Sequence, residues 1–236
     1  MLVTGASSGI GEATARAAHQ AGARVVLLAR REDRIQKIAK ELGNAVALPC
    51  DVTNSAEVLR AVQSAVDICG PIDVLVNNAG QGLDAGIEHI RIDDFRELFD
   101  LNIVAPLAMM QAVIPIMRKQ GAGSIVNVSS GATFGALPGS AAYTSSKSAL
   151  NMLSNVARVE PADVGIVVST VYPFITATEF YGSVKAGLQS ARQQVAGTAS
   201  VAHRPEQVAE MILGLIESGA AQADLVPEQY GGSFKG

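Results

Sequence analysis

A chain of 236 residues is long enough for one large α/β domain with a substantial core. Its net charge of −4 argues against a nucleic-acid-binding surface, and no apolar run is long enough to suggest a membrane-spanning helix. Cys50 and Cys69 have no metal-binding or redox spacing, and no signal peptide is visible. We therefore expect a cytoplasmic protein with reduced thiols and no metal site.

The chain begins with a predicted strand, a glycine turn and a helix. An apolar run over residues 1–4 enters TGASSGIG, and a helical pattern follows over residues 12–21. The glycines would let the backbone approach a pyrophosphate, and a helix N-terminus favours its negative charge. The spacing G-x-x-x-G-x-G differs from the common dinucleotide fingerprint, so a turn that binds nothing is the alternative. The candidate cofactor contacts in this turn are Gly5, Ser7, Ser8, Gly9, Ile10 and Gly11.

The second predicted strand, residues 24–28, bears on the choice of cofactor. In many dinucleotide-binding proteins an acidic residue near this point binds the ribose 2′-hydroxyl. Here Ala29 offers no carboxylate, and Arg30 offers a guanidinium that can bind a 2′-phosphate with two hydrogen bonds. The sequence therefore predicts NADP(H) rather than NAD(H). The alternative is that Arg30, Arg31 and Arg34 form the solvated start of a helix.

Two more strand–helix units are predicted in the next part of the chain, with helices at 32–42 and 56–68 and strands at 45–48 and 72–76. Asp51 and Val52 follow the third strand, where Asp51 could meet an adenine ring or cap the next helix. Asn78, Ala79 and Gly80 follow the fourth strand. Small residues at the carboxyl end of a parallel strand leave room for a ligand.

Residues 93–120 read as a long helix that is broken or bent near Pro106 and Pro115. Asn102 lies within it, and asparagine is a poor residue for the middle of a helix. Either a kink tolerates it, or its amide positions something at a site.

The candidate acid–base group follows the fifth strand, residues 124–128. Tyr143 and Lys147 are four residues apart in a predicted helix, so both side chains share one face. An ammonium beside a phenol favours the phenolate and lowers the pKa of the tyrosine. Ser129 or Ser130 could hydrogen-bond the same substrate oxygen. The alternative is a surface tyrosine and lysine on a polar helix.

A strand at 165–170 leads to Pro173, and residues 174–203 contain few large aliphatic side chains. This composition suits a mobile lid, although an ordinary surface helix is equally compatible. A helix at 206–218 and a strand at 223–226 follow. The glycine-rich tail is expected to be loose or docked on a partner subunit.

Taken together, these motifs resemble the classical short-chain dehydrogenase/reductase family over nearly the whole chain. The residues that carry the resemblance are TGASSGIG at 4–11, Asp51, Asn77-Asn78-Ala79-Gly80, Asn102, Ser130, Tyr143-x-x-x-Lys147 and Pro173. The resemblance implies one Rossmann-type α/β domain with about seven parallel strands, three helices on each face and a lid at about 174–203. It also selects Ser130 over Ser129, because the catalytic serine of the family lies thirteen residues before its tyrosine.

The resemblance further implies a role for each site residue. Tyr143 exchanges the proton on the substrate oxygen, and Ser130 orients that oxygen. Lys147 lowers the pKa of Tyr143 and binds the nicotinamide ribose, and Asn102 holds a water linked to Lys147. Pro173, Thr176 and Thr178 fall at cofactor-contact positions of the family. Phe174 replaces the usual glycine, which predicts a narrowed pocket or a shifted lid.

We therefore expect an NADP(H)-dependent oxidoreductase acting on a small, fairly apolar ketone or secondary alcohol. The apolar preference rests on the bulky residues expected near the pocket, which are Phe134, Leu137, Phe174, Phe180 and Tyr181. An NADP-binding sensor or structural subunit without turnover is the alternative, followed by an epimerase or dehydratase. A homotetramer or homodimer is expected because the helix at 93–120 and the helix after Tyr143 are apolar on more than one face.

Overall fold

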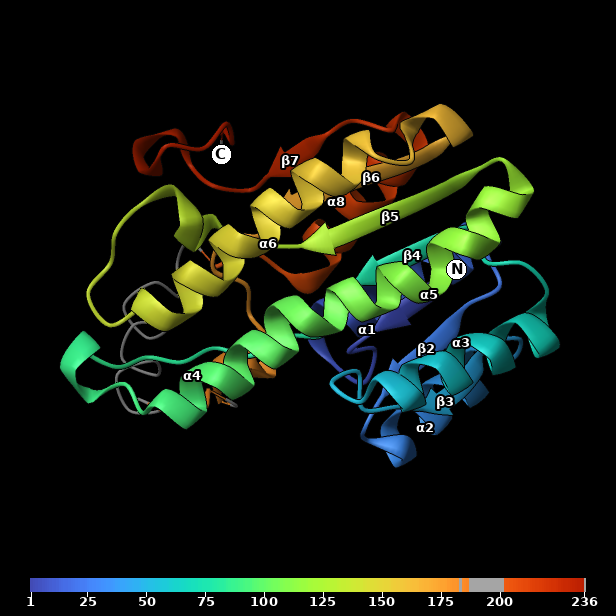
Figure 1. Cartoon of the computed structure of the whole chain (residues 1–236), viewed down its shortest axis with the longest axis horizontal. Coiled ribbons are helices and arrows are strands. Elements are labelled where there is room, and N and C mark those ends of the chain that lie inside the picture. The colour runs from blue at the N-terminus through green and yellow to red at the C-terminus, as the bar shows by residue number, and fades with distance from the viewer. Residues whose placement is uncertain (183, 187–201, 236) are drawn as a thin grey trace.

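Seven parallel strands form one central sheet in the computed structural model, which describes residues 1–182, 184–186 and 202–235 (Figure 1). The spatial order is β3-β2-β1-β4-β5-β6-β7. The strands are β1 (Leu2–Thr4), β2 (Val26–Ala29), β3 (Val46–Pro49), β4 (Val74–Asn77), β5 (Gly123–Val128), β6 (Ile166–Tyr172) and β7 (Gln222–Asp224). From β1 the chain adds strands on one side, up to β3, and from β4 it adds them on the other side, up to β7. The connections after β1 and β4 therefore lead in opposite directions, which opens a crevice at the carboxyl ends of these two strands.

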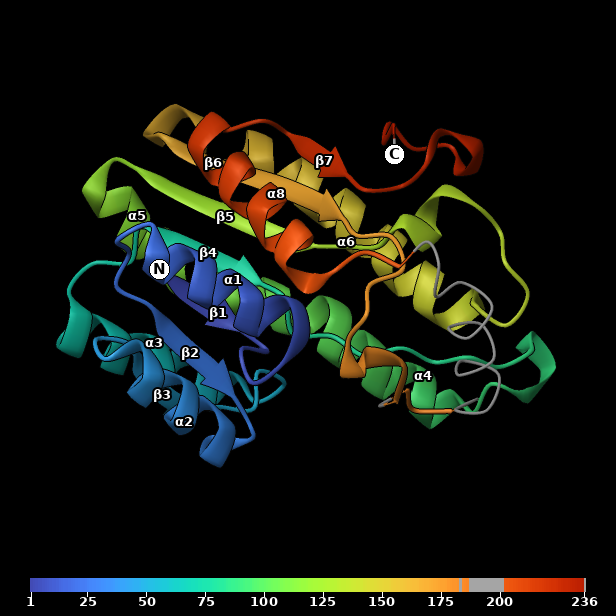
Figure 2. The same cartoon turned by 180° about the vertical axis from the view of Figure 1, so that it is seen from behind.

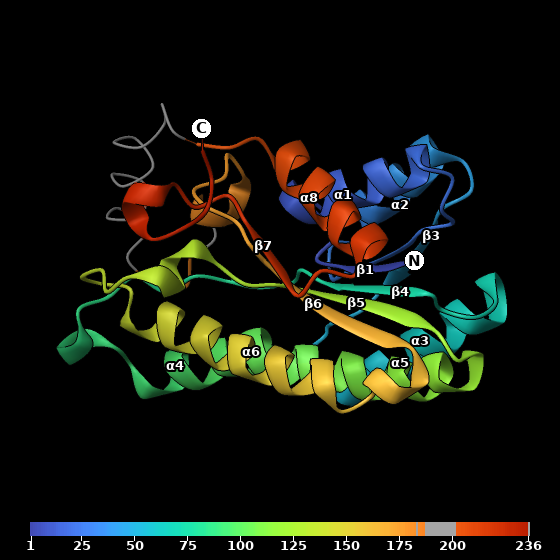
Figure 3. The same ribbon diagram turned by 90° about the horizontal axis from the view of Figure 1, so that it is seen from above.

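Helices cover both faces of the sheet. They are α1 (Gly9–Gln20), α2 (Glu32–Leu42), α3 (Ser55–Cys69), α4 (Ile92–Phe99), α5 (Ala105–Gln120), α6 (Ala141–Val159) and α8 (Pro205–Ser218). Figure 2 shows the face covered by α1, α2 and α8, and Figure 3 shows α3, α5 and α6 on the opposite face. The predicted three-layer Rossmann-type fold is therefore confirmed.

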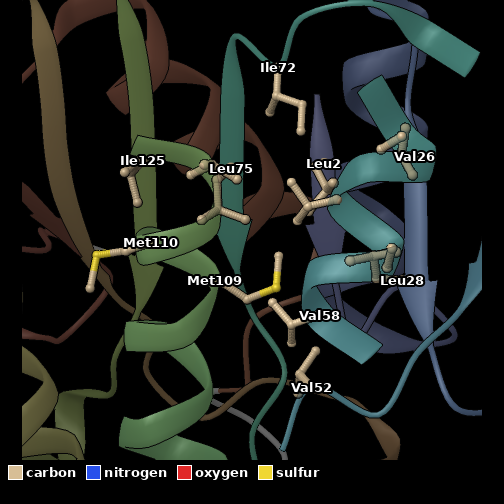
Figure 4. Close-up of a cluster of buried hydrophobic side chains, with 14 of the residues drawn as sticks. Leu2, Val26, Leu28, Val52, Val58, Ile72, Leu75, Met109, Met110 and Ile125 are labelled. Carbon is tan, nitrogen blue, oxygen red and sulfur yellow. The ribbon is translucent and has the colours of Figure 1, made fainter. Parts of the chain in front are cut away.

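Two apolar clusters hold the layers together, one on each side of the sheet. In the first, Leu2, Leu75 and Ile125 of the sheet meet Met109 and Met110 of α5 (Figure 4). The second lies under α1, α2 and α8. Because both faces are covered, the central strands β1, β2 and β4 read as nearly continuous apolar runs rather than as alternating patterns. Each fully buried leucine or valine contributes roughly 1.5–3 kcal/mol to this packing.

The long helix is not broken where the sequence predicted. Pro106 lies in the first turn of α5, where its missing N–H matters least, and α5 continues through Pro115. The irregularity is instead a π-helical turn over Asp100–Val104, which joins α4 to α5 and contains Asn102. The predicted break at Pro115 is therefore wrong, and the irregularity near Pro106 is a π turn marked by Asn102; a bend at the prolines stays a prediction.

The combined helix Ile92–Gln120 is also apolar enough, by length and composition alone, to cross a membrane, a property shared by many core helices. Its side chains Met109, Val113 and Met117 are buried against the sheet. Val104 and Leu107, in contrast, are exposed. The high hydropathy thus comes from one face that packs in the core and from a second face that the described residues leave exposed.

The C-terminal tail is docked on its own chain. Pro227 and Phe234 form an isolated β-bridge, and Asp224 Oδ1 accepts hydrogen bonds from the backbone N–H groups of Val226 and Ser233 at 3.0 and 2.9 Å. The expectation of a loose tail is therefore wrong for the described residues up to 235, and contact of the tail with a partner subunit stays a prediction.

Candidate active site

The glycine turn connects β1 to α1 with little space to spare. Gly5 and Gly9 have φ of +63° and +57°, which side-chain-bearing residues rarely adopt. A Cβ on Gly11 would lie 2.5 Å from both Asn78 Nδ2 and the carbonyl oxygen of Gly5. The N-cap of α1 is Ser8, whose side chain forms no capping hydrogen bond. The turn therefore leaves helix N–H groups available to an anion, and its residues fit the pyrophosphate of a dinucleotide.

The segment after β4 is tied to the end of β1 through Thr4. The Thr4 hydroxyl accepts hydrogen bonds from the backbone N–H groups of Asn78 and Ala79, at 2.9 and 3.0 Å. The Asn78 amide donates back to the Thr4 carbonyl at 2.9 Å. Asn78, Ala79 and Gly80 are thus held beside the glycine turn, at the crevice that the sheet order predicts.

Arg31 connects the start of α2 to the glycine turn. Its Nε and Nη2 donate to Ser7 Oγ at 3.0 and 2.8 Å, and Nη2 also donates to Ser8 Oγ at 2.6 Å. Arg30, the residue singled out in the sequence, is exposed. From the sequence alone, Arg31 had no expected role other than the alternative of a solvated helix start, so this contact was missed. The sequence did contain one indication of this contact: the two adjacent serines of the turn can accept hydrogen bonds from a cation that follows β2.

Asp51 and Val52 follow β3 at the same edge of the sheet. Asp51 Oδ1 accepts from the backbone N–H and the hydroxyl of Thr53, at 3.0 and 2.8 Å. The cap of α3 is Asn54, whose Oδ1 accepts from two backbone N–H groups. The alternative that Asp51 caps this helix is therefore wrong, and its predicted contact with adenine stays a prediction. Val52 is buried in the first apolar cluster.

Lys147 is the buried cation of the site. Its Nζ donates to the Val128 carbonyl at 2.8 Å, and burial lowers its pKa from 10.5 to about 8. At neutral pH the ammonium form therefore still predominates. Tyr143 lies one turn earlier on α6, half-buried, with its ring centroid 5.7 Å from that of Phe180. The two predicted residues are brought together on one helix, with a positive charge held near the phenol.

Asn102 links the segment after β4 to α6. It is fully buried, and its Nδ2 donates to the Gln81 carbonyl at 3.0 Å and to Ser146 Oγ at 2.9 Å. Its Oδ1 accepts from the backbone N–H of Gln81 at 3.1 Å. Ser146 in turn donates to the Tyr143 carbonyl at 2.7 Å. Asn102 thereby fixes the helix that carries Tyr143, and Ser146, three residues after that tyrosine, is a supporting residue that sequence reasoning missed.

Gly80 lies between Asn102 and Lys147. A Cβ at this position would be 3.2 Å from Asn102 Oδ1 and 3.4 Å from Lys147 Nζ. The glycine therefore lets the predicted asparagine and lysine approach the same point of the crevice.

The two serines after β5 have different environments. Ser129 is buried, and its hydroxyl donates to Asn151 Oδ1. Ser130 is partly exposed and begins the 3₁₀ turn Gly131–Phe134, where its Oγ accepts from the Ala132 N–H at 3.1 Å. That contact leaves the Ser130 hydroxyl hydrogen for another acceptor, whereas the Ser129 hydroxyl is already used inside the protein. The environment agrees with the choice of Ser130.

The segment after β6 returns to the glycine turn. Pro173 is buried, and its carbonyl accepts from the Gly131 N–H at 2.8 Å. Thr176 donates to the Phe174 carbonyl, while the Thr178 methyl lies 3.0 Å from the point where a Gly9 Cβ would be. Thr178 and Gly9 line a cleft of about 590 Å³ together with Ser8, Arg34 and Glu179. Most of the predicted lid, residues 183 and 187–201, lies outside the described residues.

The aromatic residues expected around the pocket serve different purposes. The Phe174 ring stacks on Tyr230 of the tail at a centroid distance of 5.3 Å, and Phe134 packs against Tyr172 at 5.1 Å. Leu137 is exposed. The Phe180 ring packs against the Tyr143 ring. Phe174 is therefore a packing partner of the C-terminal tail, which accounts for a bulky ring where the resemblance led us to expect glycine.

Comparison with known proteins identifies the class to which this fold and site belong. The profile of the short chain dehydrogenase family matches residues 1–189. The chain belongs to this family and is an oxidoreductase of the short-chain dehydrogenase/reductase type. A curated relative from Staphylococcus aureus (strain N315), described as an uncharacterized oxidoreductase, is 35% identical over 174 residues, which cover 73% of this chain and 75% of the relative.

Solved structures with the same fold hold nicotinamide cofactors of both kinds. A closed form of serine dehydrogenase complexed with NADP⁺ is 29% identical, with a TM-score of 0.88, and the match covers 100% of this chain and 96% of that one. A 3-ketoacyl-(acyl-carrier-protein) reductase from Brucella melitensis, complexed with NADH, is 26% identical, with a TM-score of 0.86 and 95% of each chain covered. Membership of the family alone does not decide between NADP(H) and NAD(H).

Proposed function

We propose that the protein is an NADP(H)-dependent oxidoreductase that interconverts a small, fairly apolar ketone and the corresponding secondary alcohol, with Tyr143 as the general acid and base. The observation that carries the proposal is the buried ammonium of Lys147, one helical turn from Tyr143 and next to Gly80 at the carboxyl edge of the sheet. A buried charge is costly, so a site that retains one has a use for it. The Phe180 ring beside Tyr143 supports an apolar substrate.

The cofactor supplies the hydride in reduction and accepts it in oxidation. In the reductive direction the Tyr143 hydroxyl donates its proton to the carbonyl oxygen of the substrate, and the Ser130 hydroxyl donates a hydrogen bond to that oxygen. The Lys147 ammonium stabilises the phenolate left on Tyr143. Asn102 and Ser146 hold α6 in position, so the phenol is oriented before the substrate arrives.

The preference for NADP(H) is supported by the cations beyond β2. Arg31 already donates to the hydroxyl groups of Ser7 and Ser8. Its guanidinium, these two hydroxyl groups and the predicted contact of Arg30 would together provide donors suited to a 2′-phosphate. Pyrophosphate binding is assigned to the glycine turn and Thr178. The structure of the related serine dehydrogenase holds NADP⁺, which agrees with this choice.

Replacing Tyr143 by phenylalanine tests the acid–base role. We expect kcat/KM for NADPH oxidation with a panel of small ketones to fall at least about 100-fold, because proton transfer from a positioned acid contributes 10²–10⁴-fold. The affinity for NADPH should change little. Tyr230→Phe removes a phenolic hydroxyl outside the site and serves as the matched control. Undiminished turnover in Tyr143→Phe would remove the proposed role.

Cofactor titration tests the second part of the proposal. We expect the wild type to bind NADPH at least about tenfold more tightly than NADH, and Arg30→Ala and Arg31→Ala to weaken NADPH binding while leaving NADH binding nearly unchanged. Calorimetry on the purified chain measures all of these affinities. Equal affinity of the wild type for the two cofactors would contradict the assignment.

A further inference from the structure

Glu179 is bound between the two arginines at the start of α2. Its Oε2 accepts from Arg31 Nη1 at 2.8 Å, and both of its carboxylate oxygens lie 2.8 Å from Arg34 Nη1. Glu179 begins the 3₁₀ turn Glu179–Gly182 after β6, so it reaches these arginines from a distant part of the sequence. Hydrogen bonds from Arg31 and Arg34 lower the pKa of Glu179 to about 2, so the carboxylate is ionised at all ordinary pH values.

The donors around Glu179 are those that a phosphate monoester requires. Arg31 uses its remaining nitrogens on Ser7 Oγ and Ser8 Oγ, so two guanidinium groups and two hydroxyl groups are connected around Glu179. A carboxylate and a phosphate present similar oxygen acceptors to a guanidinium, and Arg binds either with two hydrogen bonds. Two anions at these guanidinium groups compete for the same N–H donors, and they repel one another.

We propose that Glu179 is a cofactor-specificity residue, which competes with the 2′-phosphate of NADP(H) for Arg31 and Arg34 and is displaced when that phosphate binds. This inference rests on the proposed function and deepens it. NAD(H) carries no 2′-phosphate and leaves the carboxylate on the arginines. Glu179 therefore reduces the preference for NADP(H) that Arg31 and Arg34 would give by themselves.

Glu179 is adjacent in sequence to a residue that contacts the proposed catalytic tyrosine. Phe180, which follows Glu179 directly, packs against the Tyr143 ring. Beyond it the backbone N–H of Lys185 donates to the Gly82 carbonyl at 2.9 Å, and its ammonium pairs with Glu97 of α4. Glu179 is thus joined directly to a residue that packs on Tyr143.

The test replaces Glu179 by glutamine, which removes the charge and preserves the shape of an exposed side chain. Adenosine 2′,5′-bisphosphate and AMP are titrated calorimetrically into the full-length chain, so that the readout is independent of turnover. We expect Glu179→Gln to bind the bisphosphate about five- to tenfold more tightly than the wild type, since two exposed ion pairs no longer compete. The affinity for AMP should stay within about twofold.

Glu206→Gln is the matched control, because Glu206 lines the same cleft from the first turn of α8. Removing its charge changes the field of the cleft without freeing Arg31 or Arg34, so the gain should stay below about twofold. An equal gain in both variants, or none in Glu179→Gln, overturns the competition. If the wild type and the variant both bind AMP and the bisphosphate with equal affinity, the proposed preference for NADP(H) is refuted as well. A wild-type preference for the bisphosphate that Glu179→Gln leaves unchanged overturns the competition alone.

Discussion

Lys147 combines a functional charge with a cost to stability. Its ammonium is enclosed by protein and has one hydrogen bond to the Val128 carbonyl. Burial disfavours the charged form, so the pKa of Lys147 falls to about 8 from 10.5. A shift of this size corresponds to roughly 3 kcal/mol of unfolding free energy lost while the folded state keeps the proton.

We therefore expect Lys147→Met to be inactive and yet at least as stable as the wild type near neutral pH. The lost hydrogen bond to Val128 offsets about 1 kcal/mol of the gain. The sign follows from proton binding: between about pH 8 and 10.5 the unfolded chain holds the lysine proton while the folded chain has released it. The stability of the wild type relative to the variant should rise through that window.

Urea unfolding of both proteins at about pH 7 and about pH 9.5 measures this change. The variant should be the more stable at the lower pH, and the difference should shrink at the higher pH. A difference that does not depend on pH would show that Lys147 does not titrate in the folded state as burial requires.

The sequence could predict a cation after β2 but not which arginine reaches the turn. Arg30 and Arg31 are the same residue type at adjacent positions, so the sequence does not distinguish them. Their side chains nevertheless point in different directions, because successive residues at the end of a strand alternate in direction. Arg31 is the N-cap residue of α2, and its side chain reaches Ser7. The choice depends on the path of the backbone between β2 and α2, which single-residue preferences do not encode.

At the scale of elements, most strands and helices follow directly from apolar runs and periodicity. The predicted helix at 32–42 has the observed bounds, because Gly43 ends it sharply at φ +81°. The π-helical turn at Asp100–Val104 was missed, since proline was taken as the breaker. A π turn is stabilised by tertiary contacts, here those of Asn102 with Gln81 and Ser146, and such contacts are not visible in a local pattern.

The stack of Phe174 on Tyr230 should couple the segment after β6 to the C-terminal tail. Because offset or stacked aromatic pairs are worth about 0.5–1.5 kcal/mol beyond area burial, we expect a coupling free energy of about 1 kcal/mol between Phe174→Leu and Tyr230→Leu. Denaturant unfolding of the two single variants and the double variant measures it.

Phe99→Leu paired with Tyr230→Leu is the control for this cycle. Phe99 stacks on Phe95 of α4, so its replacement also removes an aromatic pair, but one without Tyr230. That control pair should be additive. Additivity of Phe174→Leu with Tyr230→Leu would instead mean that the tail is held by its backbone contacts alone.

At the scale of the whole molecule, the fold was the most predictable property. Seven strands separated by helices can form few sheets with right-handed crossovers, and the glycine turn fixes which strand leads to the ligand. The crevice and the positions of Asn102, Tyr143 and Lys147 follow from that order. Contacts made by surface side chains late in the chain, such as Glu179 on Arg31, depend on geometry that the pattern leaves open.

The uncovered apolar face predicts association into a homodimer or homotetramer. Leu107 of α5 and Met152 and Val156 of α6 are exposed on helices that cover the same face of the sheet (Figure 3), and Met152 is 65% exposed. A second copy of the chain presents an equally apolar surface, so pairing these helices across a twofold axis covers both.

We expect sedimentation at micromolar concentration to give a dimer or tetramer, and Met152→Asp to shift it to the monomer by placing a charge in the contact. Leu59→Asp, an equally exposed apolar position on α3, should leave the assembly unchanged. A monomeric wild type would refute the prediction.

The π turn also limits how the length of this chain can change. It accommodates one residue more than a regular turn within a single uninterrupted rod that reaches from the Tyr143 site to the far end of the sheet. Each α-helical residue turns the rod by about 100°, so deleting one residue here would rotate all of α5 relative to α4. The buried faces of the two helices could then no longer dock together, and Asn102 would leave its partners. In family comparisons, insertions and deletions should therefore cluster in the connecting loops and avoid residues 100–104, where a change of one residue would cost both the core and the site.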